Sequence, residues 1–199
     1  LNSQESNFCA HCGFSEFNDI PPGLHDRLAD NADATRNPAV IISTTRLIIG
    51  SFLSSGLYFF YWFYLTWKQI SSEVEGENYP FWHVMALNLP IYGFFRMHAH
   101  MRTINELASQ HGIVSTVAPG LAVLLFLLAN ILGWAIGILE NIVAVAVMNL
   151  ISITLLTVIM TMGQGVLNLY WEKSFPANTL RFARIGAGEI TIVVIGFLL

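Results

Sequence analysis

Two cysteines near the start of the chain, Cys9 and Cys12, have the spacing of a metal-binding turn. They are separated by two residues in CAHCG, where the turn aims both thiolates at one ion and the glycine lets the backbone bend beneath it. Structural zinc takes four ligands, and the chain contains 2 cysteines. The pair therefore predicts half of a structural zinc site; two free thiols or a redox pair are the alternatives.

A zinc-ribbon pattern surrounds these cysteines. The stretch LNSQESNFCAHCG resembles the second half of a short bacterial zinc ribbon, in which a polar linker ending in phenylalanine joins two CxxCG turns. The resemblance implies that Cys9 and Cys12 are two of four zinc ligands, with the other two expected upstream of Leu1. It also implies a reducing compartment for this head, because thiols remain reduced there.

Three histidines, His83, His98 and His100, form a second candidate group. A single imidazole near a membrane can ligate haem iron or chlorophyll magnesium, so each is a candidate axial ligand. On a helix His98 and His100 point about 200° apart and cannot share one metal ion. The alternative is an interfacial imidazole that is hydrogen-bonded to a lipid phosphate or a backbone carbonyl.

The composition is that of a membrane protein. Of 199 residues, 54% are hydrophobic and 11% are charged, whereas soluble domains contain about 25% charged residues. No charged side chain occurs from 113 to 139 or from 141 to 171, and a bilayer core needs about 20 apolar residues. Two transmembrane helices are therefore predicted. The net charge of −4 and the lack of a basic patch argue against a nucleic-acid partner.

The sequence predicts an all-α integral membrane protein with about four transmembrane helices, a truncated or short fifth, an amphipathic surface helix and a half zinc-ribbon head. The expected divisions are a partial zinc-ribbon knuckle at 1–15, a polar tether at 16–37 and a helical membrane domain at 38–199. The apolar segments of that domain are 38–67, 81–95, 113–139, 142–165 and 190–199. The half knuckle and the short final run lead us to expect further chain at both ends.

Two segments carry more detailed expectations. Aromatic residues from 58 to 67 favour the headgroup level, so we expect a continuous first helix with Trp67 near one interface and Arg46 near the other. After 81–95, helical spacing of apolar residues predicts an amphipathic helix on the membrane surface or against a partner, ended by a cap at Gly112. The residues with that spacing are Met97, Met101, Ile104 and Leu107.

The basic residues indicate the orientation. If the head is cytoplasmic and 38–67, 81–95, 113–139 and 142–165 all cross, only Lys68 lies outside. The remaining basic residues lie inside: Arg27, Arg36, Arg46, Arg96, Arg102, Lys173, Arg181 and Arg184. This is the positive-inside distribution, and it predicts a multi-pass protein of the inner (cytoplasmic) membrane. The bias survives if neither 38–67 nor 81–95 crosses, so a pair of re-entrant segments is the alternative.

Few polar features lie within the spans. Arg46 is expected to reach the interface by snorkelling and Glu140 by sitting in the turn between two helices. Gly133 and Gly137 form a small-xxx-small pattern, extended by Ala129, that lets helices approach closely. We expect its partner to be the neighbouring helix 142–165 rather than another subunit.

A family resemblance supports this topology. The stretches LYFFYWFYLTWKQI, NYPFWHVMALNLPIYGFF, NLYWE and RIGAGEITIVVIG resemble bacterial multi-pass membrane proteins that share a domain of unknown function, several of which carry an N-terminal zinc ribbon. The resemblance implies a membrane topology and a cytoplasmic head. It supplies no catalytic residues.

No nucleophile elbow, P-loop, dinucleotide fingerprint or metalloprotease motif is present, so we do not expect an enzyme. The first functional hypothesis is a non-catalytic membrane subunit, a scaffold or accessory component of a respiratory, photosynthetic or transport complex. Its expected partners are other membrane subunits and the lipid bilayer. The alternatives are a pigment- or haem-binding protein and a small transporter or lipid-handling protein with a regulatory zinc head.

Overall fold

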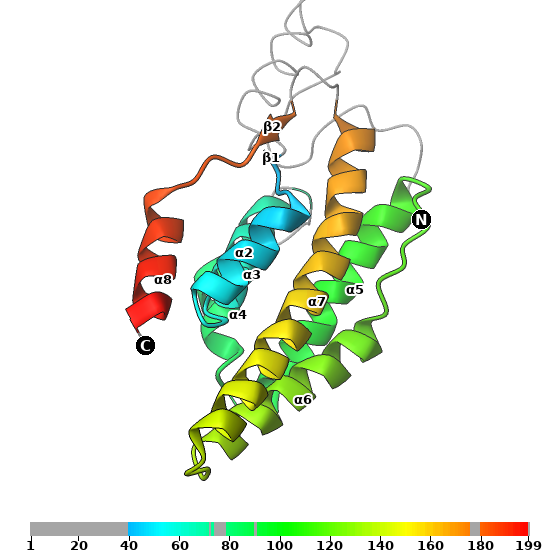
Figure 1. Cartoon of the computed structure of the whole chain (residues 1–199). Coiled ribbons are helices and arrows are strands. Elements are labelled where there is room, and N and C mark those ends of the chain that lie inside the picture. Colours follow the sequence, from blue (N-terminus) through cyan, green and yellow to red (C-terminus); the bar gives the residue numbers. More distant parts are fainter. Residues whose placement is uncertain (1–39, 72, 74–78, 90, 176–179, 199) are drawn as a thin grey trace, which may run out of the picture. The chain divides into compact units, whose positions relative to one another are not determined.

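The computed structural model describes residues 40–71, 73, 79–89, 91–175 and 180–198. The chain divides into two units, 1–37 and 38–199, and the described residues belong to the second. Cys9 and Cys12 lie outside the described residues, so the predicted zinc site stays a prediction. The second unit is mostly helical, as the sequence predicts (Figure 1).

The first apolar segment forms a helical hairpin. Helix α2 (Thr44–Leu53) and helix α3 (Tyr58–Ile70) are separated by a turn in which Ser55 and Gly56 have φ angles of 50° and 89°. The Gln69 side chain donates to the carbonyl of Val40 (3.3 Å), which brings the end of α3 back to the start of α2. The expected continuous helix over 38–67 is therefore wrong, because left-handed backbone at the turn reverses the chain.

The second apolar segment also reverses. Helix α4 (Pro80–Ala86) is followed by a turn and then by helix α5 (Tyr92–Gln110). A side chain on Gly93 would place its Cβ 2.6 Å from the carbonyl oxygen of Leu87, so the turn requires a glycine at this close approach. The segment 81–95 is thus divided between two helices rather than forming one.

Helix α5 packs inside the unit. Its predicted apolar face is buried, as Met97, Met101 and Ile104 have no exposed surface. The face lies against α6 and α7 of the same chain, which corrects the expectation of a helix on the membrane surface or against a partner. The predicted cap is confirmed, because Gly112 has a φ of 62° after the last turn.

Helices α6 (Pro119–Ile136) and α7 (Ile142–Ser174) are the two long apolar helices and lie side by side (Figure 1). Residues 113–118 are not helical, and α6 begins at Pro119, where a proline needs no donor. The Asn141 side chain caps α7 by accepting the N–H groups of Val143 and Ala144. Helix α7 extends well beyond the predicted segment 142–165.

Two short strands connect the ends of the unit. Strand β1 (Val40–Ile41) pairs in parallel with β2 (Arg181–Phe182), so the unit is not wholly α-helical. Helix α8 (Ala187–Leu198) follows and packs on α2 and α3. The Ser55 hydroxyl donates to the carbonyl of Gly196 (2.8 Å), which places the end of α8 at the turn of the first hairpin.

The core lies where both hairpins meet the second half of α7. Its largest buried side chains are aromatic and come mainly from α3 and α7: Tyr58, Phe59, Trp62, Phe63, Tyr170 and Trp171. Gly163 of α7 lets the Trp62 ring approach closely, since a Cβ there would lie 3.2 Å from the ring. The aromatic stretch 58–67 therefore packs mainly inside the protein.

Candidate functional site

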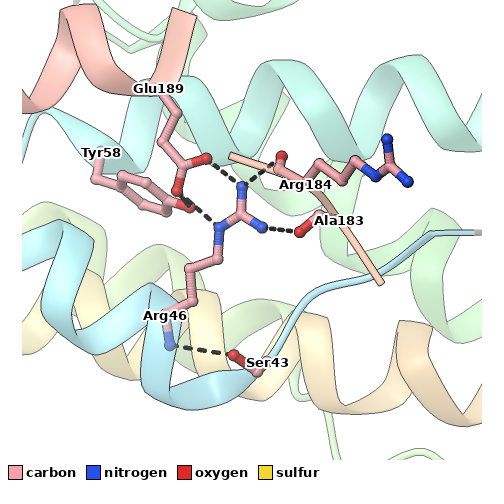
Figure 2. Close-up of polar contacts among 6 residues, drawn as sticks. All are labelled: Ser43, Arg46, Tyr58, Ala183, Arg184 and Glu189. Atoms are coloured by element: carbon pink, nitrogen blue, oxygen red, sulfur yellow. Dashed lines mark hydrogen bonds and ion pairs between the residues drawn. The ribbon is translucent and has the colours of Figure 1, made fainter. Parts of the chain in front are cut away.

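A buried ion pair joins the two ends of the unit (Figure 2). Arg46 lies in the first turn of α2, whose N-cap is Ser43, and Glu189 lies in the first turn of α8. Arg46 Nε donates to Glu189 Oε1 (2.7 Å), and Arg46 Nη2 donates to Oε2. The two side chains are only 17% and 7% exposed. This two-point arrangement is the strongest form of an arginine–carboxylate pair.

The remaining groups of the pair are also bonded. Arg46 Nη1 donates to the carbonyl of Ala183, and Nη2 donates to that of Arg184 (3.0 Å). The Tyr58 hydroxyl donates to Glu189 Oε1 (2.9 Å). The cluster connects α2, α3 and the segment that leads into α8, and the charges are compensated by hydrogen bonds as buried charges require. Its geometry is that of a structural clamp.

This cluster differs from the sequence expectation for Arg46. The side chain does not snorkel to an interface as a lone charge; it is held by Glu189, which the sequence reasoning did not single out. The signal available was two opposite charges, each isolated beside an apolar helix. Their separation of 143 residues concealed the pairing.

A second buried cluster surrounds His100. The imidazole has no exposed surface and packs on Phe63 and Trp67, with ring centroids 4.4 Å and 5.1 Å away. Its Nε2 lies 3.0 Å from Thr66 Oγ1. Because the Thr66 hydroxyl donates to backbone carbonyls of its own helix, its oxygen accepts from His100, which assigns the proton to Nε2.

The protonation of His100 follows from this environment. His100 lies on α5, which is not one of the two membrane-length helices, α6 and α7. Burial lowers the pKa of His100 to about 3, with a smaller contribution from neighbouring His83. The imidazole is therefore neutral at physiological pH, with Nε2 bonded and Nδ1 buried without a partner among the described residues.

The three candidate histidines have different surroundings. His83 stacks on Trp67 with ring centroids 4.4 Å apart, so His83 and His100 share one aromatic neighbour. His98 is exposed, which confirms that it points away from His100. A haem iron needs a nitrogen that faces open space, and His100 offers none. The geometry of the His100 ring is that of a packing group.

A polar network crosses the core between α3 and α7. The Trp62 indole N–H donates to Gln164 (2.9 Å), and the Gln164 amide donates to Asn168 (2.8 Å). Asn168 in turn donates to the carbonyl of Ile42 and accepts its N–H. The sequence reasoning missed Gln164 and Asn168, whose spacing of four residues on one helix face was the available signal.

A mainly apolar cavity is lined by the start of α3, the turn between α4 and α5, and parts of α6 and α7. Its volume is about 490 Å³. Lining residues include Phe59, Leu89, Phe94, Phe126, Gly133 and Trp134. Of the predicted small-residue stripe, Ala129 is buried and its carbonyl accepts the Ser152 hydroxyl of α7 (3.1 Å). Gly133 instead lines the cavity and has no neighbour within 4 Å of its Cβ position.

Metal-binding geometry is not found in the described part of the chain. Within these residues no three His, Cys, Asp or Glu side chains are grouped to hold an ion. The two candidate sites with built polar contacts are therefore the Arg46–Glu189 cluster and the His100 cluster. Both are satisfied mainly within the protein, and both position helices.

Fold and site together define a mostly helical protein in which two helices of the described residues are long and apolar enough to cross a membrane. Comparison of the chain with protein-family models, curated proteins and solved structures gives no match. The resemblance to bacterial multi-pass membrane proteins thus stays a prediction.

Proposed function

We propose that this chain is a non-catalytic integral membrane subunit that acts as a scaffold or accessory component of a larger complex. The observation that carries the proposal is the exposure of α6 and α7. Each helix contains an 18-residue apolar window, yet only 17% of that window is buried inside the unit. A helix of this kind in a soluble core is mostly covered, so a surrounding of lipid accounts for the pattern.

Helix lengths support a two-crossing arrangement. At 1.5 Å per residue, the 18 residues of α6 span about 27 Å and nearly cross a hydrocarbon core of about 30 Å. The 10 residues of α2 reach about 15 Å. Because the apolar segments 38–67 and 81–95 both reverse, they enter the bilayer part-way as re-entrant segments, which was the alternative to four crossings, and the charged part of α5 from Arg96 onward stays outside the bilayer.

The charges agree with this arrangement. Every Lys and Arg of 38–199 precedes α6, or lies at the end of α7 and beyond it. If only α6 and α7 cross, these residues share one side and Glu140 lies on the other. The positive-inside rule then assigns the basic side, with the N-terminal head, to the cytoplasm of the inner membrane.

The scaffold role is supported by how the polar groups are used. The Arg46–Glu189 cluster and the Trp62–Gln164–Asn168 network hold helices together through bonds that are complete within the protein. Exposed aromatic side chains on α4, Phe81 and Trp82, offer a surface to other membrane subunits. A zinc-stapled head built on Cys9 and Cys12 would provide a docking module on the cytoplasmic side.

Cysteine accessibility tests the topology. In a background with Cys9 and Cys12 replaced by serine, Glu140→Cys should react with a membrane-impermeant maleimide in intact spheroplasts. Ser109 lies in the last turn of α5, on the side proposed to be cytoplasmic. Ser109→Cys should therefore react only after permeabilisation. The proposed crossing would be contradicted if both positions were labelled from outside. It would also be contradicted if neither variant were found in the membrane fraction.

A lipid-handling role is the second candidate, because the cavity beside Gly133 is mainly apolar and is lined by residues of both membrane-length helices. The geometry gives no comparable support to haem or pigment binding by His100.

A further inference from the structure

The apolar cavity is placed to bind a membrane component. Its volume of about 490 Å³ lies in the range of about 300–1,000 Å³ that is usual for small-molecule pockets. Three phenylalanines, Phe59, Phe94 and Phe126, come from three different helices to form one region of its wall. At the other region Gly133 and Trp134 lie one turn before the end of α6, and Trp134 is 66% exposed.

Three polar side chains line the cavity: Asn88 is exposed, whereas Asn130 and Ser152 are bonded to the protein itself. The Asn130 amide donates to the carbonyl of Phe126 (2.8 Å), and the Ser152 hydroxyl donates to that of Ala129 (3.1 Å). Because these donors are occupied by the protein itself, they do not require a polar ligand. The surface that remains suits hydrocarbon.

The shape of the cavity favours a flexible chain over a helix. From Phe126 back toward its start, α6 is covered by α5, through the Phe94–Phe126 ring contact (5.7 Å) and the bond from Asn105 to the carbonyl of Val117 (2.8 Å). A partner helix about 10 Å wide that followed α6 across the membrane would meet α5. A single hydrocarbon chain is narrower and can terminate inside the cavity before it reaches α5.

We propose that this cavity holds one acyl chain of a phospholipid from the leaflet beside the Glu140 turn. The inference rests on the proposed crossing of α6 and α7, which places the Gly133–Trp134 end of the cavity in that leaflet. The open space at Gly133 is essential to it, because Gly133 lines the cavity and no atom lies within 4 Å of the position of a Cβ there. A leucine at Gly133 would fill the space that the chain occupies.

Gly120 provides a matched control. It lies on the same helix, is exposed, and likewise has no atom within 4 Å of its Cβ position, but it does not line the cavity. Gly120→Leu and Gly133→Leu therefore make the same chemical change on α6, in one case outside the cavity and in the other inside it.

Native mass spectrometry of the full chain, purified in mild detergent, tests the proposal. The wild type and Gly120→Leu should retain one phospholipid, and Gly133→Leu should retain about tenfold less, since the leucine displaces roughly two methylenes of buried chain. Retention that is equal in the two leucine variants, or absent in the wild type, would overturn it. Retention of a polypeptide in place of lipid would do so as well.

Two further measurements separate the possible failures. Gly133→Ala adds one methyl to open space and should show an intermediate loss of lipid even if the leucine variant does not fold. Alkaline carbonate extraction of the wild type reports on membrane insertion alone. Extraction into the soluble fraction refutes the proposed function, whereas a membrane-retained protein with unselective lipid binding refutes only the acyl-chain site.

Discussion

Arg46 and Glu189 show how one buried contact can fix distant parts of the chain. The pair lies at the start of both α2 and α8, and Tyr58 adds a third helix to the contact. Removal of one partner leaves a charge that is both poorly hydrated and uncompensated, which costs more than the intact pair contributes. The pair is therefore the most sensitive point of the described residues to a change of charge.

Glu189→Gln should lower the free energy of unfolding by about 3 kcal/mol, because Arg46 keeps its charge and loses its counter-ion. The double variant Arg46→Met/Glu189→Met should lose less. Unfolding by SDS in mixed micelles measures both. The exposed pair Arg102–Glu106 is the control, and Arg102→Gln should leave the transition unchanged. An equal effect of the two substitutions would contradict the clamp.

His100 makes stability depend on pH. The folded protein holds the imidazole neutral with its pKa lowered to about 3, whereas the ordinary value is 6.5. Below pH 6.5 the unfolded chain binds a proton that the folded protein does not bind. The stabilisation is therefore complete above that pH and declines by about 1.4 kcal/mol for each pH unit as the pH falls toward 3.

The variant His100→Gln keeps a donor for Thr66 and removes the titration. Its melting temperature should depend less on pH than that of the wild type between pH 7.5 and 5. His98→Gln, at an exposed position of the same helix, should keep the wild-type slope. Parallel slopes for the wild type and His100→Gln would show that the imidazole is not held neutral by the fold.

For single residues, the sequence predicts the helix face on which a side chain lies but not the distant residue that it contacts. The opposite orientation of His98 and His100 follows from 100° per residue and is confirmed, as is the buried face of α5. The bonds from Arg46 to Glu189 and from Trp62 to Gln164 join residues that are 143 and 102 positions apart. No local pattern connects such positions, so these contacts required the structure.

At the scale of helices, the turns that interrupt the apolar segments determine the fold as much as the long helices do. Left-handed backbone at Ser55 and Gly56 turns the first apolar segment into a hairpin. The letters SSG in the middle of that segment were the signal, since Ser-Gly pairs mark turns. Hydrophobicity alone predicted a continuous helix, because both arms of a buried hairpin are as apolar as a membrane span.

The hairpin turn depends on a close approach to α8. A Cβ on Gly196 would lie 2.0 Å from the carbonyl oxygen of Ser54, so Gly196→Ala should displace α8 and lower the melting temperature. Gly165→Ala, at a helical position with no neighbour within 4 Å, should be neutral or stabilising by up to about 1 kcal/mol. Equal melting temperatures would refute the close contact of α8 with this turn.

In the described part of the molecule, α6 and the first half of α7 are largely exposed and apolar, while the polar network of Gln164 and Asn168 lies in the second half of α7. The sequence predicted both long helices from their composition. It did not predict that α7 would continue from an exposed half into a half that carries Gln164 and Asn168, because the helix is apolar on average over its whole length. The number of crossings depends on reversals that composition does not encode.

If the molecule serves as a subunit, its native size should exceed that of a monomer. Extraction in a mild detergent followed by native electrophoresis should show a larger assembly, and Trp82→Ala, at an exposed aromatic position of α4 that is 67% exposed, should weaken it. A lone monomer under gentle extraction would count against the scaffold role while leaving the membrane topology intact.

The contacts between the first hairpin and the last helices also have a consequence for biosynthesis. Ile42 meets Asn168 and Arg46 meets Glu189 only after 126 and 143 further residues have left the ribosome. At about 5–20 residues per second, the nascent chain exposes the first hairpin for roughly 6–30 s before its partners exist. Insertion factors or early lipid contacts must shelter an aromatic surface during that interval, so slow translation should hinder maturation of this protein more than that of one with local pairing.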